Sequence, residues 1–437
     1  MIWAILVLAT VLRLVSLNQS FWLDEATSGI VARDMNLPQL FTFIRGDFHP
    51  PLYYLLLHFW GQIFGYSEIS LRMPSVIFGL ATIYLVYLIS GRKLIAPLLL
   101  AFSGLHIYYS QEARMYAMSA FLVTAIVYFF LKLLGKPQKS DWVWFTLLLP
   151  VNFLSDYLPN LILPAIWLVA ILKRKGVDWW RQFLLSHLLL FTTILIWLPF
   201  LVTQLRSGVL VAQTMPGWWV VLGGATLKNL ALLAVKFSIG RISFENQLVY
   251  AGIAGGMLLL EGWVLVKTAR KNWVLWLLFL VPITLAFVLA FEVHVFSYFR
   301  LLFVLPIFYI LLTTGVKRLW PVLLVLNSLF AICYLLFPRY HREDWRGLVQ
   351  TLEADSSRFA FVLPTPNQRE ALYYYRPNFR LYYSPLKNDS FEKVYLMRYV
   401  AEIVDPKDLA RQEIESLGYQ KVDELNFNGV VVWEYLK

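Results

Sequence analysis

The chain has 437 residues, of which 59% are hydrophobic and only 15% are charged. A soluble domain carries roughly a quarter charged residues, so this composition excludes an ordinary soluble protein. The formal net charge of +11 does not indicate a nucleic-acid partner, because much of the Lys and Arg lies in short loops between apolar stretches. The single cysteine, Cys333, excludes disulfides and a cysteine-based zinc site.

Apolar stretches close to the ~20 residues that a helix needs to cross the hydrocarbon core recur along the chain. The first, at 2–17, lacks the basic start and the Ala-x-Ala site of a signal peptide, so we predict an uncleaved span. Further spans are predicted at 72–91, 94–109, 116–134, 142–156, 158–172, 183–203, 247–266, 273–291, 300–315 and 319–337. The predicted fold class is an α-helical polytopic membrane protein with about 11 transmembrane helices.

The basic short loops set the orientation of these spans in the membrane. Five such loops are expected on the cytoplasmic side, at Arg92–Lys93, Lys136/Lys139, Lys173–Lys175, Lys267/Arg270/Lys271 and Lys317–Arg318. The N-terminus then lies inside, and residues 18–71 and 204–246 form external loops. Residues 217–237 are apolar but contain glycines and lysines, and a span there would reverse the Lys267–Lys271 loop. We therefore predict an interfacial helix within the second external loop.

From Pro338 the chain becomes much more charged, which indicates a second domain. A small α/β fold is predicted from strand-like runs at 359–363, 393–397 and 428–435 and helix-like stretches at 344–354 and 405–417. We divide the chain into a transmembrane domain at 1–337 and an extracytoplasmic α/β domain at 338–437. The tyrosines at 373–375 and 382–383 either stack on sugars or pack within the small core.

The first external loop begins with two adjacent carboxylates, Asp24 and Glu25. Trp22 and Leu23 precede them, and such apolar neighbours can partly desolvate a carboxylate, which raises its proton affinity and makes it a better base. The alternative is structural, with Asp24 capping a short helix over Ala26–Ala32 and Glu25 in its first turn. Both roles can hold for different members of the pair.

The same loop continues with Asp-Phe-His-Pro-Pro-Leu, from Asp47 to Leu52. The two prolines stiffen the chain, and Pro51 is expected to start a helix over Leu52–Phe64. His49 then lies just ahead of a helix and is held in place. It is either part of a site or a surface histidine that makes a hydrogen bond.

The next external turn contains Glu112, Arg114 and Tyr116. Charged residues at the boundary of a span are costly unless they are paired or face a watery cavity. The planar guanidinium of Arg114 suits a phosphate, because it offers two parallel hydrogen bonds. The alternative is an ion pair with Glu112 or with another acid of the external loops. Arg300, at the external start of a later span, raises the same question.

Together these motifs resemble a known family. The Asp-Glu pair after the first span, the His-Pro-Pro-Leu element from His49 and the Gln-Glu-x-Arg-x-Tyr element from Gln111 are familiar in this order. They resemble bacterial members of the protein O-mannosyltransferase and aminoarabinose transferase superfamily, the GT-C-fold polyprenyl-phosphate-sugar glycosyltransferases. The resemblance is strongest over 1–135 and continues through Tyr298-Phe299-Arg300 and Glu343-Asp344-Trp345-Arg346. It implies a GT-C-like fold with a long first external loop.

The resemblance also implies roles for the candidate residues. Asp24 matches the catalytic base, Glu25 is expected to hold the site or the acceptor, and Arg114 matches the arginine that contacts the carrier phosphate. The other substrate-binding candidates are His49, Glu112, Tyr116 and Arg300. Some relatives bind a divalent metal near the sugar phosphate and others need none. This sequence shows no clear ligand cluster, so a metal cofactor stays open.

The reaction expected from this resemblance is a single displacement. Phosphate is a good leaving group when cations offset its charge, so one carboxylate, Asp24, suffices to take the proton of an acceptor hydroxyl, and the anomeric carbon inverts. The expected partners are a polyprenyl-phosphate sugar donor, a lipid, glycan or protein acceptor and the membrane, without nucleic acid. The expected location is a cell membrane, as in the bacterial inner or plasma membrane, with the site outside the cytoplasm. The competing hypotheses are a transporter or flippase of lipid-linked sugars and an enzyme that uses diphosphate-linked donors.

Overall fold

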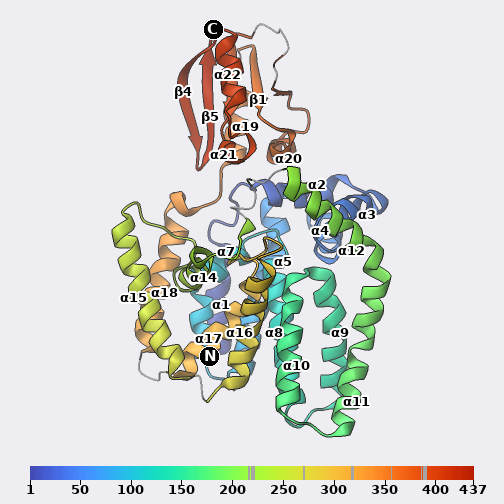
Figure 1. Ribbon diagram of the computed structural model, residues 1–437. Helices are drawn as coiled ribbons and strands as arrows, with labels where there is room; N and C mark the ends of the chain where they lie inside the picture. The colour runs from blue at the N-terminus through green and yellow to red at the C-terminus, as the bar shows by residue number, and fades with distance from the viewer. Residues whose placement is uncertain are drawn as a thin grey trace.

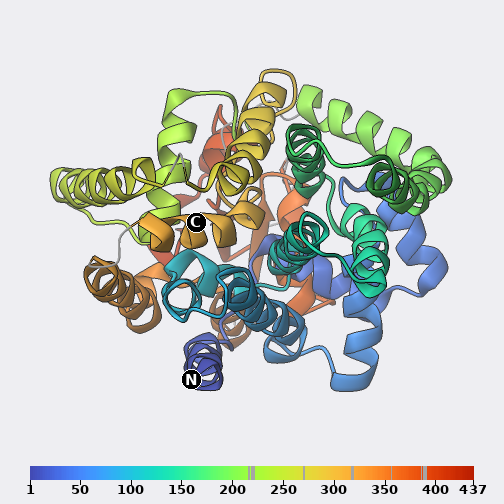
Figure 2. The ribbon, with the colours of Figure 1, turned by 90° about the horizontal axis from the view of Figure 1, so that it is seen from below.

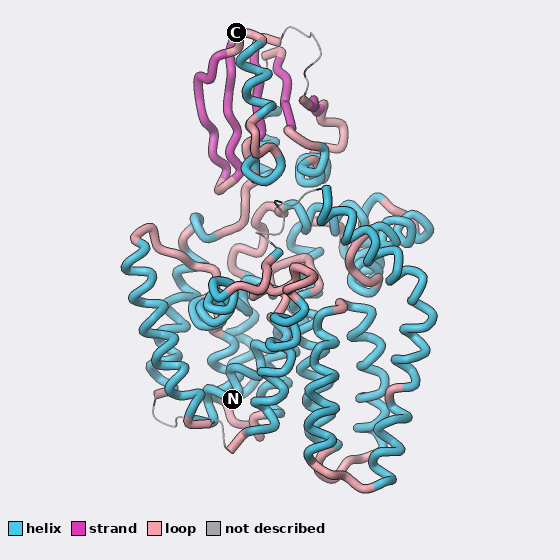
Figure 3. The backbone as a smooth tube through the Cα atoms, in the orientation of Figure 1, coloured by secondary structure: helices cyan, strands magenta, loops and turns pink. Residues whose placement is uncertain are grey.

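The computed structural model describes the whole chain except residues 215, 216, 218–221, 269, 270, 316–318, 356, 385 and 387–390. A bundle of helices carries a small domain with a β-sheet at one end, and the short helices of residues 23–64 lie at that same end (Figure 1, Figure 3). Seen from below, the N-terminal helix lies at the rim of the bundle (Figure 2). The site residues of the first loop are therefore placed between the bundle and the small domain.

The helices before Pro338 follow one another through short connections. They are α1 (Ile2–Leu14), α2 (Leu23–Asp34), α3 (Leu37–Gly46), α4 (Leu52–Phe64), α5 (Glu68–Ile89), α6 (Ile95–Ala101), α7 (Gly104–Ser110), α8 (Tyr116–Leu133), α9 (Lys139–Ser155), η1 (Leu158–Leu161), α10 (Ile162–Leu172), α11 (Val177–Ser186), α12 (Leu188–Thr214), α14 (Leu227–Ile239), α15 (Gln247–Val266), α16 (Trp273–Leu289), η3 (Leu302–Val304), α17 (Leu305–Gly315) and α18 (Trp320–Leu336). The predicted helix over Leu52–Phe64 is confirmed, with Pro51 at its N-cap.

The membrane-crossing character of the bundle is carried by long apolar helices. Four segments of the described chain are long and apolar enough to cross a membrane: Glu68–Ile89, Tyr116–Leu133, Val177–Val211 and Gln247–Val266. Shorter apolar helices lie at Ile2–Leu14, Leu158–Leu172, Trp273–Leu289, Leu302–Thr314 and Trp320–Leu336. Each of these segments overlaps a predicted span, while the total of about 11 spans stays a prediction.

One predicted span, at 94–109, is two short helices instead of one. The chain breaks after α6 at Phe102, and Ser103 caps α7 by accepting a hydrogen bond from the backbone N–H of His106. Gly240 passes against this break with a φ of +81°, and a Cβ there would lie 3.0 Å from the backbone nitrogen of Leu105. Two chain segments therefore approach more closely than a residue with a side chain would allow.

The interfacial helix was predicted within 217–237, and residues 218–221 of this stretch lie outside the described residues. In the described residues of this stretch the helix is α14, which begins at Leu227 and is capped by Thr226. It is seen nearly end-on in Figure 1, whereas its neighbours α15 and α18 run along the bundle. Residues 218 and 219, Arg270 and the Lys317–Arg318 loop lie outside the described residues. The N-terminus and the turn between α10 and α11 lie at the end opposite the small domain (Figure 1).

The segment after Pro338 forms a five-stranded sheet with helices. Its elements are η4 (Pro338–Tyr340), α19 (Trp345–Ala354), β1 (Phe359–Leu363), η5 (Pro366–Gln368), α20 (Glu370–Tyr375), β2 (Leu381–Tyr383), β3 (Lys393–Met397), α21 (Ala401–Val404), α22 (Leu409–Ser416), β4 (Gln420–Phe427) and β5 (Val430–Leu436). The strand order is β2-β1-β3-β5-β4, parallel within β2-β1-β3 and antiparallel across β3-β5-β4. The predicted runs at 359–363 and 393–397 are strands, whereas β2 and β4 were not predicted.

The small domain is docked onto the first loop by polar and aromatic contacts. The hydroxyl of Tyr375 accepts a hydrogen bond from the backbone N–H of Phe21 at 2.7 Å and donates one to Glu68 at 2.9 Å. Gly29 of α2 lies under Tyr374, so that a Cβ at Gly29 would be 2.6 Å from the ring. The absence of a side chain at Gly29 therefore lets α20 lie directly on α2.

Candidate active site

Asp24 lies in the first turn of α2, at the end of the bundle that faces the small domain. The N-cap of α2 is Trp22, so the alternative in which Asp24 caps the helix is wrong. Asp24 and Glu25 are both in the first turn, where the N-terminal end of the helix dipole favours negative charge. The side chain of Asp24 is 46% exposed, whereas that of Glu25 is fully buried. Only Asp24 of this pair is therefore accessible to an incoming group.

Arg114 converges on Asp24 from the turn before α8. Its Nη2 lies 3.6 Å from Asp24 Oδ2, and its side chain is only 6% exposed. The same guanidinium donates from Nη1 to Ser28 Oγ at 3.3 Å, and its Nη2 lies 3.3 Å from His49 Nε2. The expected ion pair with an acid of the external loops is present, and the partner is Asp24. Two segments that are far apart in sequence thus meet at one carboxylate.

His49 is the third member of this group. Its Nδ1 lies 3.1 Å from Asp47 Oδ2, and Asp47 also accepts a hydrogen bond from the Tyr54 hydroxyl at 2.8 Å. Because a guanidinium only donates, we assign the acceptor role to His49 Nε2 and the proton to Nδ1. Burial would raise the pKa of Asp47, but His49, the Tyr54 hydroxyl and Arg114 together hold it well below its usual range. Asp47 therefore stays ionised and orients the imidazole.

Glu25 binds the surrounding segments together. Arg72 donates to both of its carboxylate oxygens, at 2.8 and 2.6 Å, and Arg342 Nε lies 3.2 Å from Oε2. The backbone N–H of Ala113 donates to Oε1 at 2.7 Å. Burial opposes ionisation, but these cations and hydrogen bonds keep the pKa of Glu25 below its usual value. Glu25 is placed to position the site, not to contact a substrate.

Glu112 lies in a cluster of arginines near Glu25. Arg342 Nη2 lies 3.3 Å from Glu112 Oε2, and the guanidinium groups of Arg342 and Arg241 lie 4.1 and 4.4 Å from the ring centre of Tyr108. Burial raises the pKa of Glu112 to about 7, although Arg342, Arg241 and Arg114 oppose this. The cluster thus combines several cations with a carboxylate that gives up its proton only near neutral pH.

Several buried polar atoms of this cluster have no partner. Among the described residues, Arg114 Nε, Arg342 Nη1 and Glu112 Oε1 are buried and make no hydrogen bond within the chain. Buried polar groups are normally satisfied, and each exception calls for a water, an ion or a ligand. Two of these three atoms belong to guanidinium groups, which is the chemistry that an anion requires.

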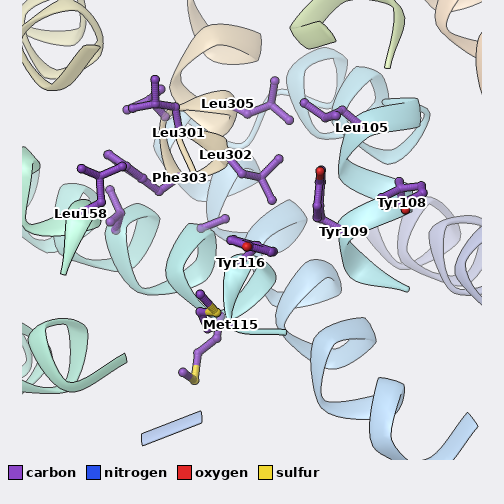
Figure 4. Packing of buried hydrophobic residues seen from close by; sticks show 14 of the residues in the cluster. Leu105, Tyr108, Tyr109, Met115, Tyr116, Leu158, Leu301, Leu302, Phe303 and Leu305 are labelled. Atoms are coloured by element: carbon purple, nitrogen blue, oxygen red, sulfur yellow. The ribbon is translucent and has the colours of Figure 1, made fainter. Parts of the chain in front are cut away.

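Tyr116 and Arg300 lie on the apolar side of the site. Figure 4 shows Tyr116 next to Tyr109 and Leu302, and the ring centroids of the two tyrosines are 5.3 Å apart. Arg300 is half-buried, and its charge acts on Asp156, the residue that follows α9. Burial raises the pKa of Asp156, and the charges of His49 and Arg300 oppose this. The structure therefore brings Arg300 to the same region as His49.

The sequence analysis did not identify four charged residues of this region: Arg72, Arg241, Arg342 and Asp156. Arg72 and Arg342 pair with Glu25, and the charge of Arg241 acts on Glu112. Asp156 adds a carboxylate near His49. Arg72, Arg241 and Asp156 are charged residues near the end of a helix, which is the signal that could have pointed to them. As for metals, no group of three or more His, Cys, Asp or Glu that could hold an ion occurs in the described part of the chain.

Comparisons with known proteins bear on the family resemblance and the fold. Residues 48–202 match the family model described as dolichyl-phosphate-mannose-protein mannosyltransferase. No curated protein matches the sequence. Among solved structures, the fold is similar to ArnT from Cupriavidus metallidurans in the apo state, with a TM-score of 0.56 and 14% identity over 99% of this chain and 97% of that one. A structure of the same ArnT bound to undecaprenyl phosphate matches with a TM-score of 0.55 and 12% identity over the same shares.

The coverage of these matches decides what they show. The structural match runs through the bundle and the small domain, and the family model includes His49 and Arg114. The TM-scores show a shared fold, and at 12% and 14% identity the match shows the fold alone. The reaction has to be inferred from the site. The chain has the fold of ArnT, and the resemblance inferred from its motifs is confirmed: it is similar to the GT-C-fold polyprenyl-phosphate-sugar glycosyltransferases.

Proposed function

We propose that this membrane protein is a glycosyltransferase that moves a sugar from a polyprenyl-phosphate carrier to an acceptor hydroxyl, with Asp24 as the general base. The observation that carries the proposal is the contact between Asp24 and Arg114, 3.6 Å apart, at the end of an apolar bundle. A base for the acceptor and a cation for the leaving phosphate are the two groups that such a transfer needs.

The chemistry balances with these groups alone. The acceptor oxygen attacks the anomeric carbon while Asp24 takes its proton, and the bond from that carbon to the phosphate oxygen breaks. The electron pair stays on the phosphate, where Arg114 is placed to offset the added charge, with Arg241 and Arg342 close by. One displacement from the face opposite the phosphate inverts the anomeric carbon.

The donor class is inferred from the lipid surroundings and the comparisons. The unpartnered Arg114 Nε and Arg342 Nη1 suit a phosphate, and the apolar helices around the site suit a polyprenyl chain. The ArnT structure bound to undecaprenyl phosphate supports the same carrier here. We place the site on the outer face of a bacterial cytoplasmic membrane, because the basic short loops favour the cytoplasmic side for the far end of the bundle.

The test is transfer from a radiolabelled polyprenyl-phosphate sugar by the full-length chain in its own membranes. Asp24→Asn should bind the carrier lipid as wild type does and lose on the order of 10²–10⁴ in transfer rate, the usual contribution of a general base. Wild-type turnover by this variant would refute the role of Asp24. Label that crosses the bilayer without entering a product would favour a transporter or flippase instead.

A further inference from the structure

A cavity lies between helices of the first loop and the small domain. Its volume is about 830 Å³, within the range of small-molecule sites, and one face each of α2, α3 and the start of α20 lines it. In Figure 1 these three helices lie together where the bundle meets the domain. We call it the α2–α3–α20 groove and define it by Thr27, Asp34, Gln39, Thr42, Glu370 and Tyr373.

The groove begins one helical turn from Asp24, which is not itself among its lining residues. Thr27 follows Asp24 by one helical turn on the same side of α2, and Asp34 lies two turns further along. The negative charge of Asp24 also reaches Glu370, where it adds to burial in raising the pKa of that carboxyl. A molecule that lies in the groove can therefore present one end to Asp24.

The lining of the groove combines an aromatic face with many hydrogen-bonding groups. Tyr373 is 38% exposed, and Asp34 and Glu370 are about one-third exposed. Thr27 and Thr42 also line the groove, together with Arg369 and aliphatic side chains of α2 and α3. A sugar has both an apolar ring face and a rim of hydroxyls, so an aromatic ring with carboxylates around it matches its chemistry.

The same lining does not suit an extended peptide. Peptides that bind by strand addition need a free strand edge, and the described lining comes from helices and the residues that flank them. The groove also lies at the end of the bundle next to the small domain (Figure 1), so an acceptor can reach it from water.

From these observations we infer that the α2–α3–α20 groove is the acceptor site and that the acceptor is a carbohydrate, bound with one sugar stacked on Tyr373 and its reactive hydroxyl directed to Asp24. This inference rests on the proposed function. It gives the small domain a defined task, because α20 contributes Tyr373 and Glu370 to the groove.

The test replaces the gene for the wild-type chain with variants and supplies the resulting membranes with radiolabelled polyprenyl-phosphate sugars extracted from the source cells. Tyr373→Ala should lower transfer about tenfold at limiting acceptor, through KM and not through kcat, because one stacking contact is lost. Tyr373→Phe keeps the ring and should transfer as wild type does. Tyr382→Ala removes a tyrosine of the same domain outside the groove and is the matched control. Binding of undecaprenyl phosphate should be equal in all four chains.

The label must also end in the right kind of product. We expect exhaustive protease digestion to leave the size of the labelled wild-type product unchanged, because the labelled sugar is attached to a carbohydrate and not to a peptide. Label in a peptide, or wild-type KM in Tyr373→Ala, would overturn the inference while Asp24→Asn remained inactive. Transfer by Asp24→Asn would instead bring down the proposed function, so the two failures are distinguishable.

Discussion

Arg342 Nε lies 3.2 Å from Glu25 Oε2, and this contact joins the first loop to the segment that leads into the small domain. Both side chains are buried, with exposures of 1% and 0%. Arg72, in α5, forms a second ion pair with the same carboxylate, 2.6 Å from Oε2. The position of Asp24 next to Glu25 is therefore set by cations from two other parts of the chain.

Replacing Glu25 should destabilise the protein strongly. Glu25→Gln leaves Arg72 and Arg342 buried without their counter-charge, and breaking a buried pair in this way costs about 3–5 kcal/mol. The measurement is thermal unfolding in detergent. The control is Glu353→Gln, which removes an exposed partner of Arg376 and should change stability by less than about 1 kcal/mol. Equal melting temperatures for the two variants would contradict the structural role of Glu25.

Arg114→Lys should weaken both catalysis and carrier binding. The guanidinium contacts Asp24, His49 and Ser28 at once, and an ammonium cannot reproduce this planar set of donors. We expect kcat/KM to fall about 10–100-fold, equivalent to about 1.4–2.7 kcal/mol of lost transition-state stabilisation. Steady-state transfer and the Kd for undecaprenyl phosphate are the two readouts. Arg376→Lys, an exposed arginine of the small domain, serves as the control, and wild-type kinetics in Arg114→Lys would exclude a phosphate role.

The stability of the protein should depend on Glu112 between about pH 4.5 and 7. The pKa of this carboxyl is raised from 4.5 to about 7 by burial, so in this window the folded chain holds a proton that the unfolded chain releases. The unfolded state then binds fewer protons, and the free energy of unfolding falls as pH rises, by on the order of 3 kcal/mol. Thermal melts of wild type and Glu112→Gln at several pH values isolate this effect. The free energy of unfolding of Glu112→Gln should rise relative to that of wild type up to about pH 7, and the difference should then stay constant. A difference between the two proteins that does not depend on pH would argue against the raised pKa of Glu112.

Gly29→Ala should loosen the docking of the small domain. The added methyl group would lie 2.6 Å from the ring of Tyr374, and overpacking of this kind costs about 1–3 kcal/mol. Limited proteolysis between α18 and α19 and the melting temperature both report the change. Gly46→Ala is the matched control, because nothing lies within 4 Å of a Cβ at Gly46. Resistance to protease equal to that of wild type would show that α2 and α20 stay in contact despite the added methyl group.

The candidate site was predicted in part. Asp24, His49 and Arg114 were identified by residue type and position in external loops, and in the structure Arg114 contacts both Asp24 and His49. Arg72 and Asp156 were not identified, because a charged residue at a helix end looks the same in sequence whether it is paired in a site or exposed at a surface. The break between α6 and α7 was missed for a related reason, since Gly240 comes from a distant segment.

The sequence by itself determined that the chain lies in a membrane, where its apolar stretches recur, and that a charged α/β segment follows them, because composition and periodicity are local properties. It also determined the start of α4 at Pro51, since proline acts on its own backbone. Only the tertiary structure decided that Glu25 is buried and Asp24 exposed, that Arg114 pairs with Asp24, and that α20 closes a groove beside it. Those outcomes depend on which segments pack together, and a carboxylate's role is set by the cations and water that packing leaves around it.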